Sequence, residues 1–186
     1  RQLVVDTRGE GAGRYSVGLQ HPVVLAMMRV FQQLERACLG VHIIVDNHIP
    51  VESGLSAETA FHVAGVIGAS NLLGSPLSRE EALAVAVETG GRSVSVAAAV
   101  LGGLAAGFTD DAGLIYRRLA APSLKVIIAL PEVEMYSRRA RGAVPDRAAL
   151  SDALANISRV PLLVEGLRVG DTALIARALD DRLRQP

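Results

Sequence analysis

The pattern of apolar and polar positions in the first quarter of the chain predicts a strand, a helix and a second strand. Residues 3–6 predict the first, short strand. Residues 22–39 carry apolar side chains at helical spacing, with Pro22 suited to the first turn and Gly40 to the C-terminal cap; one face holds Val23, Met27, Val30, Phe31 and Leu34. The β-branched run at residues 41–46 predicts the second strand.

The segment that follows, Ile49 to Ala60, is a Gly/Ser-containing turn between that strand and a helix predicted over residues 60–73. The first N–H groups of a helix have no partner within it and lie at the positive end of its dipole, so such a turn can bind an anion. Gly54 also lacks the Cβ that would keep a phosphate away. The candidate phosphate- or nucleotide-binding residues are Ser53, Gly54, Leu55, Ser56, Ala57, Glu58 and Thr59.

The rest of the chain alternates helical and extended patterns. Ser78 and Glu81 form a capping box for a helix that begins at Arg79 and is stopped by Gly90 and Gly91. The remaining predicted elements are a helix at 96–101, a hairpin turning at 110–113, a strand at 124–130, and helices at 137–144, 150–169 and 171–183, with Gly170 and Asp171 as stop and N-cap. Paired strands covered by helices predict an α+β sandwich.

Composition narrows the class of partner. Half of the 186 residues are apolar and the formal net charge is zero, so the chain can bury a core and shows no charge footprint for nucleic acid. Aromatic residues make up 3% and Trp is absent, which favours a small-molecule partner over a base-stacking or membrane surface. Cys38 is the one cysteine, and with no signal-like start it predicts a cytoplasmic location.

The order of segments resembles the GHMP small-molecule kinases and, within them, the homoserine kinases. The matching landmarks are 49–55, 77–81, 96–103, 110–119, 140–145, 156–159 and 180–186. This resemblance implies a two-layer sandwich of antiparallel or mixed sheet and helices, with a GHMP N-terminal-type domain at 1–130 and the start of a C-terminal helical, substrate domain at 131–186. It also implies that an N-terminal β-rich portion and a C-terminal portion of the family have no counterpart here.

The resemblance further implies ATP and magnesium as cofactors, homoserine or a similar small molecule as substrate, a step of threonine biosynthesis, and a homodimer. The family's Gly-Leu-Gly-Ser-Ser-Ala loop falls on residues 54–59, where Gly54 and Leu55 match. Glu58 stands at the position of a serine expected near the metal. Its carboxylate would repel ATP if it lay in the phosphate cradle, whereas an acid in the first helical turn is also an ordinary surface choice, and we prefer the second interpretation.

The family's Glu-Gly-His-Pro-Asp-Asn motif falls on residues 90–95. Gly90 takes the place of the metal-binding carboxylate and Val94 that of the other acid, so no metal ligand is predicted there. Glu88 could substitute only from a different helix face. Arg92 replaces a substrate-contacting histidine; it could bind a phosphate or carboxylate bidentately, or be a solvated arginine at a helix C-terminus.

In the second half, Arg141 matches an arginine that homoserine kinases direct toward the amino-acid substrate, and Ser137 takes the place of a threonine. Arg141 can equally be a solvated helical arginine beside Arg138 and Arg139. His21 replaces an asparagine that the family has near the nucleotide. The predicted substrate-side contacts are Arg141, Ser137 and Arg92; the catalytic residues stay unassigned.

Three functions therefore remain open. The first is ATP-dependent phosphorylation of the homoserine hydroxyl. The second is a non-catalytic GHMP-fold scaffold or ligand-binding protein, a pseudoenzyme, which the altered motifs favour. The third is a transferase similar to beta-ribofuranosylaminobenzene phosphate synthase that uses phosphoribosyl pyrophosphate, because the Gly90-Gly91-Arg92-Ser93 segment and Thr59 resemble that family's loops.

Overall fold

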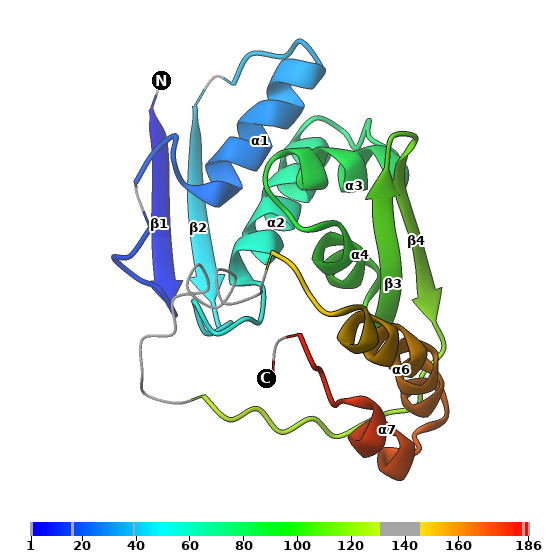
Figure 1. Ribbon diagram of the computed structural model, residues 1–186. Helices are drawn as coiled ribbons and strands as arrows, with labels where there is room; N and C mark the ends of the chain where they lie inside the picture. Colours follow the sequence, from blue (N-terminus) through cyan, green and yellow to red (C-terminus); the bar gives the residue numbers. More distant parts are fainter. Residues whose placement is uncertain (1, 16, 39, 131–145, 184, 186) are drawn as a thin grey trace. The chain divides into compact units, whose positions relative to one another are not determined.

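The computed structural model describes residues 2–15, 17–38, 40–130, 146–183 and 185 (Figure 1). They fall into two compact units, residues 1–118 and residues 119–186. Helices and small sheets alternate along the chain, so the predicted α+β class is confirmed. The predicted domain boundary at residue 130 stays a prediction.

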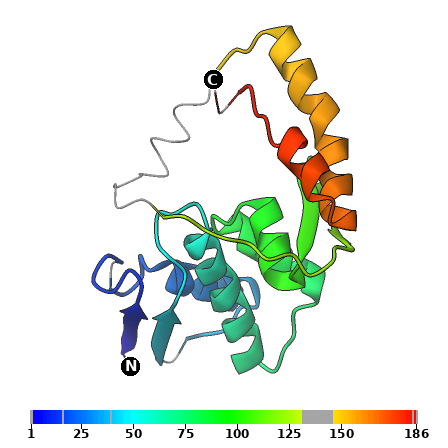
Figure 2. The same ribbon diagram turned by 90° about the horizontal axis from the view of Figure 1, so that it is seen from below.

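The first unit contains two small sheets and four helices. In chain order its elements are β1 (Leu3–Gly9), α1 (Pro22–Gln33), β2 (Val41–Asn47), α2 (Ala57–Leu72), α3 (Arg79–Glu88), α4 (Ser93–Leu101), β3 (Leu104–Asp110) and β4 (Gly113–Leu119). Strands β1 and β2 lie side by side and parallel, with Leu3 opposite Val41 (Figure 2). The hairpin predicted around residues 110–113 is present as β3 and β4, which form a second sheet.

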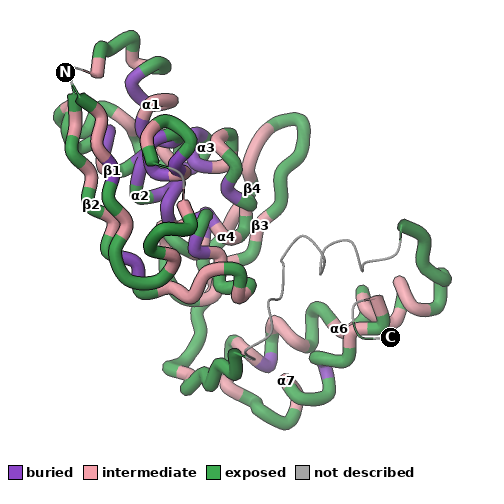
Figure 3. Tube along the Cα trace, turned by 90° about the vertical axis from the view of Figure 1, so that its left-hand side faces the viewer, coloured by how far each residue is buried: buried purple, intermediate pink, exposed green. Residues whose placement is uncertain are grey.

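The core of this unit lies where α1, α2, α3 and α4 meet, and its fully buried residues include Val30, Val66, Leu83 and Val96 (Figure 3). Helices α1 and α2 approach closely because residue 65 is glycine: a Cβ there would lie 2.3 Å from the carbonyl oxygen of Val23. This contact fixes the position of α2 and therefore of the loop that leads into it.

Helix α1 is shorter than its apolar pattern predicts. It ends at Gln33 with Leu34 as C-cap, and the predicted cap at Gly40 is wrong. Glu35 adopts a left-handed φ of 51°, and the N–H of Arg36 bonds the carbonyl oxygen of Phe31 at 2.8 Å. This reversal stops the helix well before Gly40, although the side-chain pattern continues to suit a helix.

The second unit contains α6 (Leu150–Val169) and α7 (Thr172–Ala178). Gly170 ends α6 in the left-handed conformation, and the Asp171 carboxylate accepts the N–H of Leu174 at 2.9 Å, so the predicted stop and N-cap are confirmed. Helix α7 ends at Ala178, earlier than predicted. No helix within the described ranges is long and apolar enough to cross a membrane.

The strand predicted at residues 124–130 is wrong, because this segment has no regular secondary structure and all its apolar side chains except Leu124 are exposed, 95% in the case of Ile127. An apolar run becomes a strand only beside a pairing partner, and within the described part of the chain no other strand lies next to it. The helix predicted at residues 137–144 lies outside the described residues.

Candidate functional site

The loop before α2 is an exposed turn held by one serine. The Ser53 hydroxyl donates to the carbonyl oxygen of Pro50 at 2.6 Å and accepts the N–H of Leu55 at 3.3 Å. Gly54 has a φ of 83°, a conformation that favours glycine, and a Cβ on it would meet nothing within 4 Å. Among the described residues nothing lies against Gly54, so the loop presents its backbone on that side.

Helix α2 starts without a cap. Its N-cap residue is Ser56, which has a left-handed φ of 64° and makes no side-chain hydrogen bond to the helix. The backbone N–H groups of Ala57, Glu58 and Thr59 find no acceptor among the described residues. Three donors at the positive end of a 16-residue helix are therefore available to an anion.

A second helix starts at the same place. The hydroxyl groups of Ser56 and Ser95 lie 3.2 Å apart, and this hydrogen bond joins the first turn of α2 to the first turn of α4. Helix α4 also has no side-chain cap, and within the described ranges the N–H groups of Ser93, Val94 and Ser95 have no acceptor. The two predicted motifs thus converge as two uncapped helix N-termini, which sum their partial positive charges.

Arg92 is the N-cap residue of α4 and is exposed. The interpretation that placed it at a helix C-terminus is wrong, because α3 ends at Glu88 and Thr89 is its C-cap. Within the described part of the chain no carboxylate pairs with Arg92. A permanently charged guanidinium on the N-cap residue of α4 adds to the attraction for an anion.

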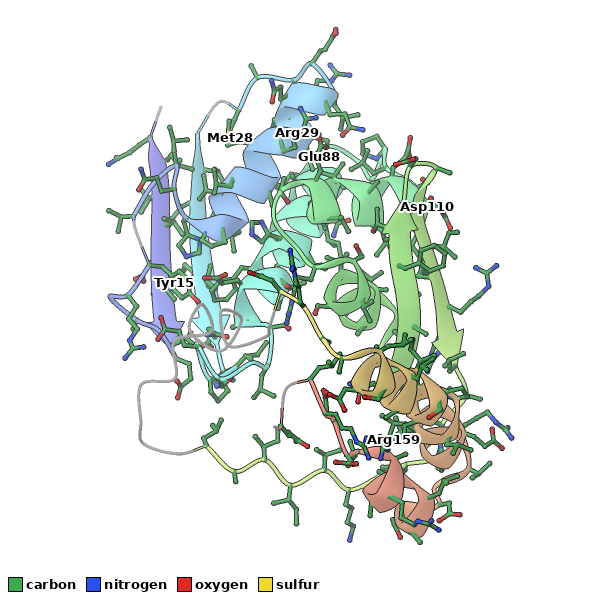
Figure 4. All side chains as sticks on the ribbon, viewed as in Figure 1. Tyr15, Met28, Arg29, Glu88, Asp110 and Arg159 are labelled. Atoms are coloured by element: carbon green, nitrogen blue, oxygen red, sulfur yellow. The ribbon has the colours of Figure 1, made fainter. Side chains whose placement is uncertain are left out.

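The carboxylates nearby do not form a metal centre. Glu58 is exposed in the first turn of α2, which agrees with its interpretation as a surface residue. Glu88 is bonded by Arg29 of α1, with Nε and Oε2 3.2 Å apart, so its carboxylate is already neutralised (Figure 4). No three His, Cys, Asp or Glu side chains in the described part of the chain converge on one point. The groups present at residues 90 and 94 do not fit magnesium.

His62, which the sequence analysis did not place in the site, lies beneath the Gly90 turn. It is 7% exposed, its Nδ1 has no hydrogen-bond partner among the described residues, and a Cβ on Gly90 would lie 3.2 Å from its Nε2. Burial lowers the pKa of His62, against a smaller opposing effect of Glu58 one turn earlier, so the imidazole is neutral. The i, i+4 spacing from Glu58 was the one sequence signal that could have found it.

His21 has a structural role. Its Nδ1 accepts the N–H of Val23 at 3.2 Å and caps α1, so its Nε2 carries the proton and donates to the Thr7 hydroxyl at 3.0 Å. Burial lowers the pKa of His21. Its ring also packs near Tyr15, whose hydroxyl pKa is raised mainly by burial (Figure 4), and near Phe61 of α2.

The groups that the candidate phosphate-binding residues leave without a partner in the described part of the chain are chiefly backbone N–H groups. The side chains of Ala57 and Thr59 are buried, while Gly54, Leu55 and Glu58 are exposed. The predicted substrate contacts Ser137 and Arg141 lie outside the described residues. What the structure adds is the convergence of Ser53 to Thr59 with the start of α4, which sequence spacing alone did not indicate.

Comparison with known proteins shows which proteins this chain is similar to. Residues 22–103 match the GHMP kinases N terminal domain. The chain is 35% identical over 179 residues to a homoserine kinase of Moorella thermoacetica, covering 96% of this chain and 60% of that protein. It is 34% identical over 185 residues to a homoserine kinase of Thermosynechococcus vestitus, covering 98% and 61%.

A solved structure, of homoserine kinase from Cytophaga hutchinsonii, superposes with a TM-score of 0.76 at 26% identity, covering 98% of this chain and 60% of that one. The chain thus spans about 60% of the length of the relatives it matches. Both predicted motifs, residues 54–59 and 90–95, fall within the matched domain. The chain is similar to the GHMP kinases and, within them, to the homoserine kinases.

Proposed function

We propose that this chain carries the phosphate-binding part of a homoserine kinase-type phosphotransferase, which transfers the terminal phosphoryl group of ATP to the side-chain hydroxyl of homoserine. The observation that carries the proposal is the meeting of two uncapped helix N-termini, α2 and α4, at the Ser56–Ser95 hydrogen bond. The substrate and the donor come from the relatives, several of which are named homoserine kinases. A cytoplasmic location and a homodimer stay predictions.

The chemistry required of this part is charge stabilisation. In phosphoryl transfer the negative charge on the phosphate oxygens must be balanced without a large rearrangement. Here the N–H groups at the start of α2 and α4 would donate to those oxygens, and the guanidinium of Arg92 would supply a full positive charge. Glu58, exposed in the first turn of α2, lowers the net attraction and makes a weak site more consistent with this chain than a tight one.

Magnesium usually neutralises part of that charge in such enzymes. In this chain Gly90 and Val94 have no side-chain oxygen, and Glu88 is held by Arg29. Among the described residues, the groups that would balance the phosphate charge are therefore the backbone amides and Arg92. Ser137 and Arg141 remain the proposed contacts for the amino-acid substrate.

The same substitutions favour a second candidate, a non-catalytic GHMP-fold protein that keeps an anion site. Because residue 90 is glycine and has no carboxylate, the His62 ring lies against it: a Cβ there would be 3.2 Å from the His62 Nε2. Such a protein would bind a phosphate-containing ligand and would not turn it over. A phosphoribosyl pyrophosphate-dependent transferase would use the same amide groups for a pyrophosphate.

Titration calorimetry of the full chain separates these functions. We expect heat on titration with ATP, and, in the presence of homoserine, formation of phosphohomoserine and ADP. Binding of ATP without turnover would support the scaffold instead. Binding of phosphoribosyl pyrophosphate in preference to ATP would support the transferase. Silence toward both donors would contradict the kinase and the transferase and leave the non-catalytic scaffold.

Arg92→Gln tests the cationic part of this site. Removing a charged hydrogen-bond donor costs roughly 1.5–3 kcal/mol, so ATP affinity should fall about tenfold or more. Arg36→Gln is the matched control, because Arg36 is an exposed arginine after α1 with no side-chain partner among the described residues. Equal affinities of the two variants would remove Arg92 from the site.

Arg141→Ala tests the proposed substrate contact. If Arg141 pairs with the carboxylate of homoserine, the variant should bind homoserine more weakly by more than about 1.5 kcal/mol, measured with ATP or a non-hydrolysable analogue present. Arg138→Ala controls for the loss of one positive charge in the same stretch. An unchanged homoserine affinity in Arg141→Ala would sink the assignment.

A further inference from the structure

A cavity of about 310 Å³ lies at the opposite end of α2 from the phosphate-type loop. Its walls come from residues 63–71 of α2, the connection at residues 75–78, the start of α3 and the end of α4. Because an α-helix rises about 1.5 Å per residue, Ser70 lies roughly 20 Å along α2 from Ala57. The cavity is therefore separate from the site described above, and its size is at the lower end of the range for small-molecule pockets.

One wall of the cavity is apolar. Its side chains are Val63 and Ile67 of α2, Leu77, Ala82 of α3 and Val100 of α4. Ile67 is 41% exposed, so this wall is in contact with solvent and is not simply an extension of the core. An apolar group placed against it would gain the free energy of burying both surfaces.

The other wall is polar and consists of Ser70, Asn71, Ser75, Ser78 and Arg79. Ser70 is 6% exposed; its oxygen accepts the N–H of Leu77 at 3.4 Å, and its own proton has no acceptor within the described ranges. The Oδ1 of Asn71 accepts from the Ser75 hydroxyl at 3.1 Å, which leaves its amide N–H groups. Arg79 can only donate, and none of the described carboxylates pairs with it.

No carboxylate lines this cavity in the described part of the chain. The nearest acid of the capping box, Glu81, already bonds the N–H of Ser78 at 2.8 Å. Ser70, Asn71 and Arg79 thus have donor groups that no described protein atom accepts, and Asn71 and Arg79 are exposed to solvent. A ligand that satisfies them must bring oxygen acceptors, and a negative charge suits the guanidinium best.

We propose that this cavity binds a small amphipathic monocarboxylate, with its carboxylate on Arg79, Asn71 and Ser70 and its apolar body against Ile67, Ala82 and Val100. This site is independent of the phosphate-type loop and of the proposed kinase activity. Charged groups buried beside apolar surface need paired donors, which is what the polar wall supplies. A body of about ten to twelve non-hydrogen atoms fits a cavity of this size.

The test uses 4-phenylbutanoate as the probe and 4-phenylbutylamine as its cationic counterpart of similar length. Each is titrated into the full ¹³C-methyl-labelled chain and followed by NMR. The expected result is that 4-phenylbutanoate shifts the methyl signals of Ile67, Ala82 and Val100 with saturable, roughly millimolar affinity. The amine should bind at least tenfold more weakly, because its charge is repelled by Arg79.

Two pairs of variants locate the probe. Arg79→Gln should weaken 4-phenylbutanoate at least tenfold, whereas Arg36→Gln should not. Ala82→Leu fills the cavity and should abolish binding of both probes, whereas Ala84→Leu, on the exposed side of α3, should leave it unchanged. Far-UV circular dichroism confirms that each variant stays folded.

Equal affinity for the two probes would overturn the proposal, because it would mean that the donor wall does not select charge. The proposal also fails if Arg79→Gln binds as well as the unmodified chain, or if no methyl signal of the cavity moves at 20 mM probe, a concentration on the order of ten times the expected dissociation constant. Since Arg79 is exposed, loss of folding does not obscure this readout.

Discussion

Two helix N-termini in the same unit differ in whether their first-turn N–H groups have acceptors. At the start of α3, the Ser78 hydroxyl accepts the N–H of Glu81 at 3.2 Å and the Glu81 carboxylate accepts the N–H of Ser78 at 2.8 Å. At the start of α2, Ser56 turns its hydroxyl to Ser95 and leaves the first turn without an acceptor among the described residues. The first end satisfies itself, while the second requires water or a ligand.

The difference shows that the same residue type has different uses at the two ends. Ser78 has extended backbone dihedrals that direct its hydroxyl back over the helix, whereas Ser56 is left-handed and does not cap. An uncapped helix needs another source of stability. For α2 that source is its packing against α1, where Gly65 meets Val23.

The largest effect should come from breaking that packing. Gly65→Ala would place a Cβ 2.3 Å from the Val23 carbonyl oxygen and 2.9 Å from the Ala26 Cβ, so it should lower the free energy of unfolding by about 3 kcal/mol. Gly68→Ala, in the same helix with nothing within 4 Å of its Cβ, should raise it by about 0.5–1 kcal/mol. Urea denaturation measures both, and a similar loss in the two variants would contradict the packing argument.

Replacing each of the two serines by alanine should show directly how the stability of the two helix starts differs. Ser78→Ala takes away a helix cap and should cost about 1 kcal/mol of unfolding free energy. Ser56→Ala removes a hydroxyl that caps nothing and bonds Ser95, so it should cost less than Ser78→Ala, about 0.5 kcal/mol. If Ser56→Ala were as destabilising as Ser78→Ala, the start of α2 would have to be capped in solution.

The smallest effect is a pH dependence from the buried histidines. Burial lowers the pKa of His21 and of His62 in the folded state, so the unfolded chain binds more protons as the pH falls below about 6.5. Stability should be fully present above that pH and should decrease as the pH falls toward the folded-state pKa values.

His21→Asn isolates one of these groups. Asn can cap α1 through its side-chain oxygen but cannot titrate, so its urea midpoint should fall less than that of the unmodified chain between pH 7.5 and pH 5.5. Parallel losses in the two proteins would show that His21 does not contribute to the pH dependence.

Local signals were sufficient wherever the structure depends on neighbours in sequence. The three-residue spacing of Ser78 and Glu81 predicted a capping box that is present, and Gly170 with Asp171 predicted the break between α6 and α7. The prediction of a strand at residues 124–130 failed because a strand needs a partner that local sequence does not specify. The prediction that α1 continues to residue 39 failed because Glu35 adopts a left-handed conformation, for which glutamate has no special preference.

The sequence predicted the two loops of the candidate site but did not predict that they lie next to each other. The loop at Gly54 and the altered motif at Gly90 were both identified from the sequence, but the hydrogen bond that joins their two helices links residues 39 positions apart. The same is true of Glu88, whose partner Arg29 lies 59 positions away, and of His62 beneath Gly90. Contacts of this kind depend on how the helices pack, which residue spacing does not reveal.

The central claim is that the starts of α2 and α4 together bind a phosphate-containing anion. The most direct test is a ¹⁵N–¹H NMR titration of the full chain with ATP and, separately, with tripolyphosphate. The account predicts that the amide signals of Ala57 to Thr59 and of Ser93 to Ser95 shift together with one affinity, while those of Arg79 to Glu81 at the capped end of α3 stay in place. Shifts at α3 alone, or none at either end of the α2–α4 pair, would contradict it.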